Sequence, residues 1–220
     1  MRLALCARTA PVLESSDDVL SRRVDVRDEK AVDAFARAAE SRFGSIDLWI
    51  NNAGVLEPIA PLRDLSAGEF RDHLDVNLVG VFLCTRAYVR HLRRLRRSGV
   101  LINVSSGAAW HGYAGWSAYC AGKAGVDRLT ECVQLEEQAE GLLRAHAVAP
   151  GVIDTDMQAL IRACTPDVFP EVERFVEMKR NDSFNSPGFV ARHLLAIAFD
   201  PASRPPEVTV RLPDEKPPLP

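Results

Sequence analysis

The feature that most constrains the fold is the alternation of short apolar runs with longer segments of helical periodicity. Apolar runs predict strands at 3–6, 46–50, 100–104, 145–148 and 207–211, with a weaker strand at 22–24. Between them, apolar side chains recur at helical spacing over 29–43, 66–97 and 119–137. This alternation is typical of βαβ units and a parallel sheet. We therefore predict one layered α/β domain over residues 1–220, built on a parallel sheet, with a flexible tail from about residue 212.

Composition narrows the classes of partner. A net charge of -3 in 220 residues gives no electrostatic reason to expect nucleic acid or an anionic membrane. No apolar run approaches the roughly 18 residues of a membrane span, and the run at 3–6 is too short for a signal peptide. The five cysteines are scattered and form no C-x-x-C pair, which argues against a disulfide framework or a metal site. We expect a cytoplasmic protein.

The strongest chemical signal is Tyr119 followed four residues later by Lys123 in a predicted helix. Side chains at i and i+4 lie on one face of a helix. An ammonium beside a phenol favours the phenolate, so we expect the pKa of Tyr119 to fall from its reference of about 10. Such a tyrosine can donate a proton to a carbonyl oxygen. The pair alone is also compatible with an ordinary surface helix.

Ser106 gives this pair its context. It lies thirteen residues before Tyr119, just after the strand predicted to end at Val104. Ligands bind at the carboxyl ends of the strands of a parallel sheet. Ser106 is therefore placed where a substrate carbonyl needs a hydrogen-bond donor, whereas its neighbour Ser105 is expected to cap a turn.

Five motifs resemble, in order, the series of the short-chain dehydrogenases/reductases: Asn51-Asn52-Ala53-Gly54, Asp75-Val76-Asn77, Ser106, Tyr119 with Lys123, and Pro150-Gly151. The resemblance extends from Leu3 to about Arg211, and it implies a Rossmann-like doubly wound parallel sheet. It implies a catalytic set of Asn77, Ser106, Tyr119 and Lys123 that reduces a small-molecule carbonyl, with Asn77 holding a water in a proton relay to Lys123. It also implies a homodimer formed through the helices at 70–97 and 119–137.

The resemblance further implies a nicotinamide cofactor. Asn51, Ala53 and Gly54 would line its adenine–ribose side, Asp25 and Val26 the adenine ring, Tyr119 and Lys123 the nicotinamide ribose, and Pro150, Gly151, Val152 and Thr155 the carboxamide. Arg8 follows the first strand, where NAD enzymes usually carry an acid. A guanidinium pairs with a 2′-phosphate in forked geometry, so NADP(H) is favoured over NAD. The alternative is a solvated arginine.

A narrower resemblance is to the sepiapterin reductase and benzil reductase branch, carried by the Tyr-Cys-Ala-Gly-Lys run at 119–123 and Asp-Thr-Asp-Met-Gln at 154–158. That branch reduces ketones and diketones with NADPH. Sepiapterin reductases hold the pterin with a carboxylate near the last strand, and residues 208–210 offer none. The resemblance therefore favours a hydrophobic diketone or aryl ketone. Four aromatic residues either wall such a site or belong to the core: Trp110, Trp116, Phe169 and Phe175.

The family begins with a strand, a glycine-rich turn and a helix, and none of these precedes Leu3. The glycines let the backbone approach the pyrophosphate, so we expect this polypeptide to bind NADPH weakly. The absent strand is central in the 3-2-1-4-5-6 order, so either a gap opens or two unusual neighbours pair. Two hypotheses stay open: an N-terminally truncated carbonyl reductase, or a degenerate, non-catalytic relative that acts through a partner or does not fold stably.

Overall fold

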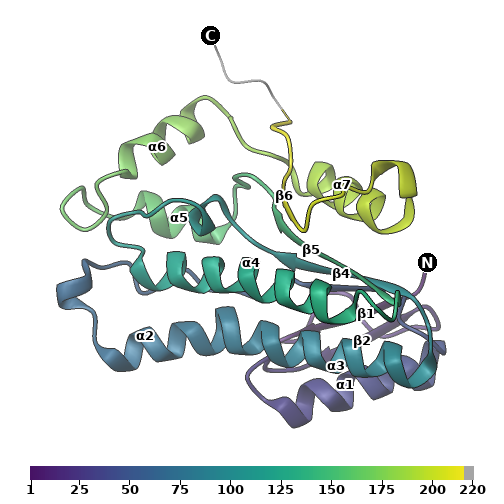
Figure 1. Ribbon diagram of the computed structural model, residues 1–220. Coiled ribbons are helices and arrows are strands. Elements are labelled where there is room, and N and C mark those ends of the chain that lie inside the picture. The colour runs from purple at the N-terminus through teal and green to yellow at the C-terminus, as the bar shows by residue number, and fades with distance from the viewer. Residues whose placement is uncertain (216–220) are drawn as a thin grey trace.

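The computed structural model describes residues 1–215 and has the predicted α/β architecture (Figure 1). The strands are β1 Leu3–Ala7, β2 Val19–Arg23, β3 Leu48–Asn51, β4 Gly99–Val104, β5 Leu143–Ala149 and β6 Thr209–Arg211. The helices are α1 Glu29–Phe43, α2 Ala67–Leu74, α3 Gly80–Leu95, α4 Ser117–Glu137, α5 Asp156–Arg162, α6 Val172–Arg180 and α7 Pro187–Phe199. The predicted order of elements is confirmed, and the loosely helical stretch before the last strand becomes α5, α6 and α7.

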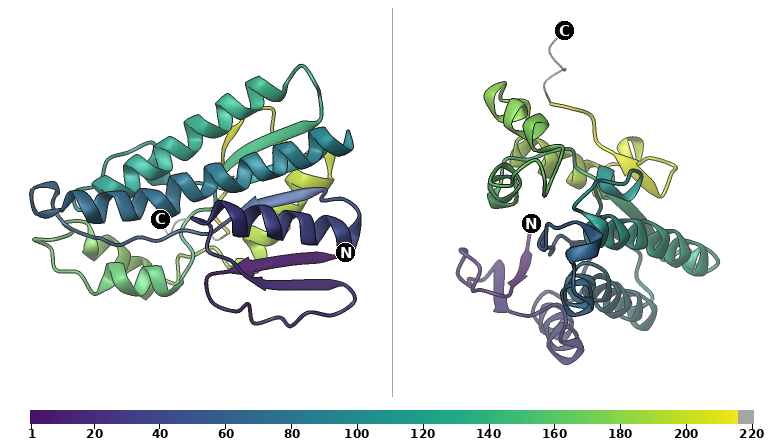
Figure 2. Two further views of the ribbon diagram at one scale, coloured as in Figure 1. Left: turned by 90° about the horizontal axis from the view of Figure 1, so that it is seen from below. Right: turned by 90° about the vertical axis from the view of Figure 1, so that its left-hand side faces the viewer.

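All strand pairs are parallel, but the strands form two sheets. β1 pairs with β2, and a four-stranded sheet has the order β3-β4-β5-β6. Among residues 1–215 no strand joins β1 to β3, and Figure 2 shows the two sheets as separate pieces. Of the two outcomes that the sequence left open, the gap is the one found.

Helices cover both faces of the larger sheet, as a doubly wound fold requires (Figure 1). Side chains alternate between the faces of a strand. Leu101 of β4 therefore belongs to the core under α1 and α3, with Trp49 and Tyr88. Its neighbours Val100 and Ile102 face the opposite way and pack with residues of α7. Leu101 and Ile102 are fully buried, so β4 is covered on both of its faces.

The helix predicted over 66–97 is interrupted. It begins with the expected capping box, in which the Glu69 N–H donates to Ser66 Oγ at 3.2 Å and the Ser66 N–H donates to the Glu69 carboxylate at 3.0 Å. Asp75–Val79 then form a π-helical turn between α2 and α3. The helix ends at Leu95, because Arg96 adopts a left-handed conformation. Single π turns of this kind occur frequently at functional sites.

The chain beyond β6 is packed where the structure describes it. Leu212 is buried, and its N–H donates to the Ala149 carbonyl at 3.0 Å. The Glu215 N–H donates to Asn185 Oδ1 at 2.7 Å. The prediction of a flexible tail from about residue 212 is therefore wrong for 212–215, and the proline-rich run 216–220 lies outside the described residues. Within residues 1–215 no helix is both long and apolar enough to cross a membrane.

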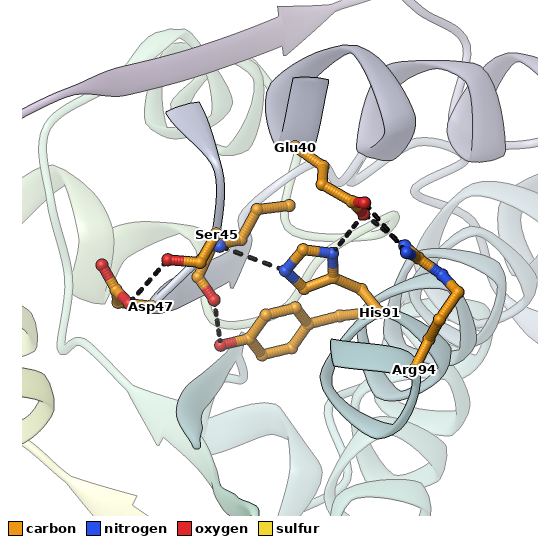
Figure 3. Close-up of polar contacts among 7 residues, drawn as sticks. Glu40, Ser45, Asp47, His91 and Arg94 are labelled. Atoms are coloured by element: carbon orange, nitrogen blue, oxygen red, sulfur yellow. Dashed lines mark hydrogen bonds and ion pairs between the residues drawn. The ribbon is translucent and has the colours of Figure 1, made fainter. Parts of the chain in front are cut away.

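A polar cluster fixes α1, α3 and the segment that enters β3 (Figure 3). Glu40 of α1 accepts a hydrogen bond from His91 Nδ1 at 2.8 Å and is bound by both terminal nitrogens of Arg94. His91 Nε2 accepts from the Ile46 N–H at 3.1 Å. The Tyr88 hydroxyl donates to the Ile46 carbonyl at 3.1 Å. The Arg94 guanidinium and His91 together lower the pKa of Glu40 to about 2 against the opposing effect of burial.

Glu40→Gln is expected to lower the free energy of unfolding by about 1–2 kcal/mol at pH 7, because it weakens charge-assisted hydrogen bonds. A depressed carboxyl pKa contributes stability that is complete above the unfolded value, near 4.5, and is lost as the pH falls toward 2. The difference in unfolding free energy between the two proteins, measured with urea, should therefore shrink as the pH drops from 5 toward 2. Glu171→Gln, in an exposed pair with Arg174, is the control and should change stability by less than about 0.5 kcal/mol.

Candidate active site

Tyr119 and Lys123 lie on one buried face of α4, where it passes the carboxyl end of β4. Both residues are less than a tenth exposed. The Lys123 ammonium is 5.7 Å from the centre of the Tyr119 ring. It donates to the carbonyl of Val104, the last residue of β4, at 2.8 Å. That bond uses one of its three protons, so the charged group has donors left for a ligand.

Ser106 starts the loop after β4. It is the N-cap of a short 3₁₀ turn, Gly107–Ala109, and the Ala108 N–H donates to its hydroxyl at 3.2 Å. The hydroxyl lies beside Tyr119 and interacts with the phenol. Ser106, Tyr119 and Lys123, chosen from the sequence, are thus brought together.

The electrostatics of the pair differ from the sequence expectation. Burial raises the pKa of Tyr119, and the Ser106 hydroxyl only partly opposes this effect. Burial also lowers the pKa of Lys123 to about 8, against the charge of Asp127. The reason is desolvation: both groups are removed from water, and each charged form is penalised before the pair can stabilise it.

Asp127, which sequence reasoning missed, supports this arrangement. It lies one helical turn after Lys123 and is buried. Its carboxylate accepts hydrogen bonds from the Ser105 hydroxyl and from Trp110 Nε1, the latter at 3.0 Å. Asp127 therefore ties α4 to the loop that carries Ser106. The available signal was its i+4 spacing from Lys123. Ser105, expected to cap a turn, instead makes this contact.

Asn77 occupies the middle of the π turn and is 1 % exposed. Its Oδ1 accepts from the Val55 N–H at 3.0 Å and its Nδ2 donates to the Val55 carbonyl at 2.8 Å. A Cβ on Gly54 would lie 2.9 Å from Asn77 Oδ1 and 3.8 Å from Lys123 Nζ. Asn77 and Lys123 therefore approach the same point on the loop after β3, and a side chain at residue 54 would collide there.

The other residues expected after β3 divide into two groups. Asn51 is buried, and its amide donates to Asn103 Oδ1 at 2.8 Å and to Thr85 Oγ1 at 3.1 Å. Its side chain thus belongs to a polar ladder between β3 and β4, and only its backbone can meet a ligand. The sequence does not single out Asn103, although this residue of β4 is the register partner of Asn51 in β3. Ala53 and Gly54, by contrast, lie in the exposed loop beyond the strand.

The residues after β5 form a tight turn that is supported by hydrogen bonds from Asn185. Gly151 has φ 77°, and a Cβ there would meet Asn185 Nδ2 at 2.6 Å. Asn185 donates through that nitrogen to the Pro150 carbonyl at 2.9 Å, and its backbone N–H donates to the Val152 carbonyl at 2.9 Å. Thr155 is the N-cap of α5, yet its hydroxyl makes no capping bond within the described residues. That hydroxyl is available to a ligand.

The predicted adenosine-side residues lie at the ends of the small sheet. Arg8 immediately follows β1, and its exposed side chain contrasts with the half-buried strand. Asp25 forms an ion pair with Arg27 at 2.6 Å, and this hydrogen-bonded pair lowers the pKa of Asp25 to about 2. Val26 packs against Gly80, the first residue of α3.

The four aromatic residues separate into a buried cluster and an exposed side chain. Three of them, Trp116, Phe169 and Phe175, are buried together. The Trp116 ring is stacked on Phe169, with ring centres 4.5 Å apart, and is edge-on to Tyr119, with ring centres 5.5 Å apart. They form an apolar wall directly behind the candidate acid. Trp110 is 41 % exposed at the rim. Among residues 1–215 no cluster of His, Cys, Asp or Glu side chains is arranged to hold a metal ion.

Comparison with known proteins places this geometry in a family. The family model for short chain dehydrogenase matches residues 3–165. Benzil reductase ((S)-benzoin forming) of Bacillus cereus is 38 % identical over 154 residues, 70 % of this chain and 61 % of that protein. The Bacillus subtilis benzil reductase is 36 % identical over 157 residues, 71 % of this chain and 64 % of that protein. The chain belongs to the short-chain dehydrogenase/reductase family of oxidoreductases.

The solved structures agree in fold. Levodione reductase has a TM-score of 0.76 and 30 % sequence identity, over 90 % of this chain and 76 % of that one. Sorbitol-6-phosphate 2-dehydrogenase of Erwinia amylovora has a TM-score of 0.76 and 28 % identity, over 90 % and 78 %. The chain spans less than two thirds of the length of the two benzil reductases.

Proposed function

We propose that this chain carries the catalytic residues of an NADP(H)-dependent carbonyl reductase that converts a ketone or diketone to an alcohol. One observation carries the proposal. The Ser106 hydroxyl, the Tyr119 phenol and the Lys123 ammonium converge at the carboxyl end of β4 in a largely dehydrated setting. A buried lysine whose pKa is lowered to about 8 beside a tyrosine and a serine is typical of a functional site.

The roles of the three follow from their chemistry. Ser106 and Tyr119 donate hydrogen bonds to the carbonyl oxygen of the substrate and polarise it. Tyr119 transfers its proton to that oxygen as negative charge develops. Lys123 holds a positive charge beside the resulting phenolate, and below its pKa of about 8 most of it is charged. The Trp116–Phe169–Phe175 wall excludes water, which strengthens these interactions.

The residues present fit the nicotinamide half of a dinucleotide cofactor, which supplies the hydride when bound. The unused donors of Lys123 suit ribose hydroxyls, and the uncommitted Thr155 hydroxyl suits a carboxamide. A Cβ at residue 54 would lie 2.9 Å from Asn77 Oδ1, so the glycine allows the backbone of this loop to lie against Asn77 close to Lys123. Arg8, exposed at the end of β1, favours the 2′-phosphate of NADP(H).

We further propose a homodimer in the cytoplasm, formed through the outer faces of α3 and α4. Phe82 of α3 and Leu135 of α4 are 41 % and 69 % exposed, as apolar residues of an interface would be in one protomer. The analogy with the family supports the same helices.

The substrate proposal is tested by assaying benzil, sepiapterin and a simple aryl ketone with either NADPH or NADH. The apolar wall beside Tyr119 predicts the highest kcat/KM for benzil with NADPH. Residues 208–210 contain no carboxylate for a pterin, so sepiapterin should be at least about tenfold poorer. A preference for sepiapterin, or for NADH, would show that the substrate or cofactor assignment is wrong.

A second candidate function rests on the divided sheet. β1 and β3 each have a strand partner on one edge only within the described residues, and unpaired buried edges are costly. This observation favours a non-catalytic family member that acts through a partner chain. Turnover of any ketone in the panel argues against it, and so does an in-frame glycine-rich turn in the nucleotides upstream of Met1. A folded protein that binds NADPH but reduces none of the three supports it.

A further inference from the structure

Next to the candidate site, α2 carries a buried histidine that the proposed mechanism does not use. His73 is 2 % exposed and lies one helical turn before Asn77. Its Nδ1 is 2.8 Å from the Glu57 carbonyl oxygen, and its Nε2 is 2.6 Å from Asn77 Nδ2. Its ring is edge-on to Tyr119, with ring centres 6.1 Å apart. His73 is thus in contact with two members of the predicted catalytic set.

The hydrogen-bond pattern fixes the tautomer of this histidine. Val55 contacts both ends of the Asn77 amide, so Nδ2 is the end that donates to the Val55 carbonyl. The second Nδ2 proton points to His73 Nε2, which must therefore be an acceptor. The ring proton is then on Nδ1, where the Glu57 carbonyl accepts it. Both protons of the Asn77 amide and both ring nitrogens are satisfied by a single neutral arrangement.

We infer that His73 is a positioning residue for the proposed carbonyl reduction: it locks the Asn77 amide, and with it the π turn and the Val55 loop, in the orientation that faces Lys123. The catalytic consequence of this inference rests on the proposed function. The contact between His73 and Asn77 is independent of that function.

Protonation of His73 would break this lock. Both nitrogens of the imidazolium are donors, so Nε2–H would face the Asn77 amide protons. The titratable groups packed against the ring are Tyr119 and Lys123 of α4. Burial and the Lys123 charge lower the pKa of His73 below its ordinary 6.5, against the Glu57 carbonyl. The hydrogen bond between His73 and Asn77 is therefore present at neutral pH and is lost only in acid.

Two variants separate the two contacts of the ring. The terminal amide of glutamine reaches the position of Nε2, so His73→Gln retains an acceptor for Asn77. The shorter amide of asparagine reaches the position of Nδ1, so His73→Asn retains the Glu57 contact and loses Asn77. Both remove the titrating imidazole. We expect His73→Asn to lower kcat about tenfold with little change in KM, the effect of one lost hydrogen bond, and His73→Gln to restore most of it.

The contact is first tested without activity, in the whole chain, by NMR. At pH 7.5 the imidazole nitrogens of His73 should report the Nδ1–H tautomer, and the Asn77 side-chain amide should exchange slowly with water. That exchange should accelerate about tenfold in His73→Asn and, in wild type, on acidification through the His73 titration. An Nε2–H tautomer, or equal Asn77 exchange in wild type and His73→Asn, overturns the inference.

The catalytic consequence is tested by the pH profile of kcat with benzil and NADPH. Wild type should lose activity on an acid limb below the ordinary histidine value, and His73→Gln should lack that limb while remaining active. Equal kcat and equal acid limbs in wild type, His73→Gln and His73→Asn overturn the positioning role. A wild type that reduces no ketone refutes the proposed function instead, and the NMR result still decides the His73–Asn77 contact.

Discussion

Tyr119→Phe is expected to reduce ketone-dependent NADPH oxidation by roughly 10²–10⁴-fold, the usual contribution of a positioned general acid. The hydroxyl is the only group removed, and the ring keeps its edge-on contact with Trp116, so the fold should be unaffected. Affinity for NADPH, measured by fluorescence titration, should change little because the phenol acts on the substrate oxygen. The loss should appear in kcat, measured at saturating cofactor.

Tyr113→Phe is the matched control. The ring of Tyr113 packs against the same Trp116 ring, with ring centres 5.0 Å apart. Tyr113 does not belong to the proposed catalytic set. The same removal of one hydroxyl should therefore leave kcat within about threefold of wild type, since only a peripheral hydrogen bond is lost. Comparable turnover in wild type and Tyr119→Phe would remove Tyr119 from its role as the acid.

Lys123→Met should change activity and stability in opposite directions. Removing the ammonium leaves the Tyr119 phenolate without its counter-charge, so kcat should fall about 100-fold or more. Burial has lowered the pKa of Lys123 from 10.5 to about 8, which means that the folded state is penalised for holding the charge. Methionine of similar length avoids that penalty, so the free energy of unfolding at pH 7 should rise by up to about 3 kcal/mol.

The sign of this effect can be tested by pH. Between 8 and 10.5 the unfolded chain binds the lysine proton and the folded chain does not, so the stability of wild type rises across this window relative to Lys123→Met. The two proteins should converge by pH 10.5. Lys179→Met is the control, because Lys179 is half exposed and pairs with Asp154 at the surface. A Lys123→Met protein less stable than wild type at pH 7 would show that the ammonium is not strained by burial.

The sequence predicted the elements whose signals are local. The capping box at Ser66 and Glu69, the helix carrying Tyr119 and Lys123, and the central strand before Ser106 are encoded by spacing within a few residues. These are the elements that place the candidate site, so its main members are predictable from the sequence.

What the sequence did not reveal depends on contacts between distant segments. The π turn at Asp75–Val79 keeps the apolar pattern of a regular helix, so periodicity does not distinguish it. Asp127 and His73 become meaningful only when Ser105 and the Glu57 carbonyl are brought beside them. The predicted fall of the Tyr119 pKa is wrong for the same reason. Burial raises this pKa, and the degree of burial follows from the packing of Trp116 and Phe169 around the ring.

The gap between β1 and β3 has a consequence for how the molecule opens. Without backbone bonds across it, the β1–β2 unit is joined to the rest through side chains such as Leu20 and Phe35, whereas β3 to β6 form one hydrogen-bonded body. Arg8 belongs to the first unit, and Tyr119 and Lys123 are carried by the helix on the second. We therefore expect the β1–β2 unit to open at a lower free energy than β3 to β6, so that the proposed affinity for the adenosine end of a dinucleotide can vary while the geometry around Tyr119 and Lys123 stays constant.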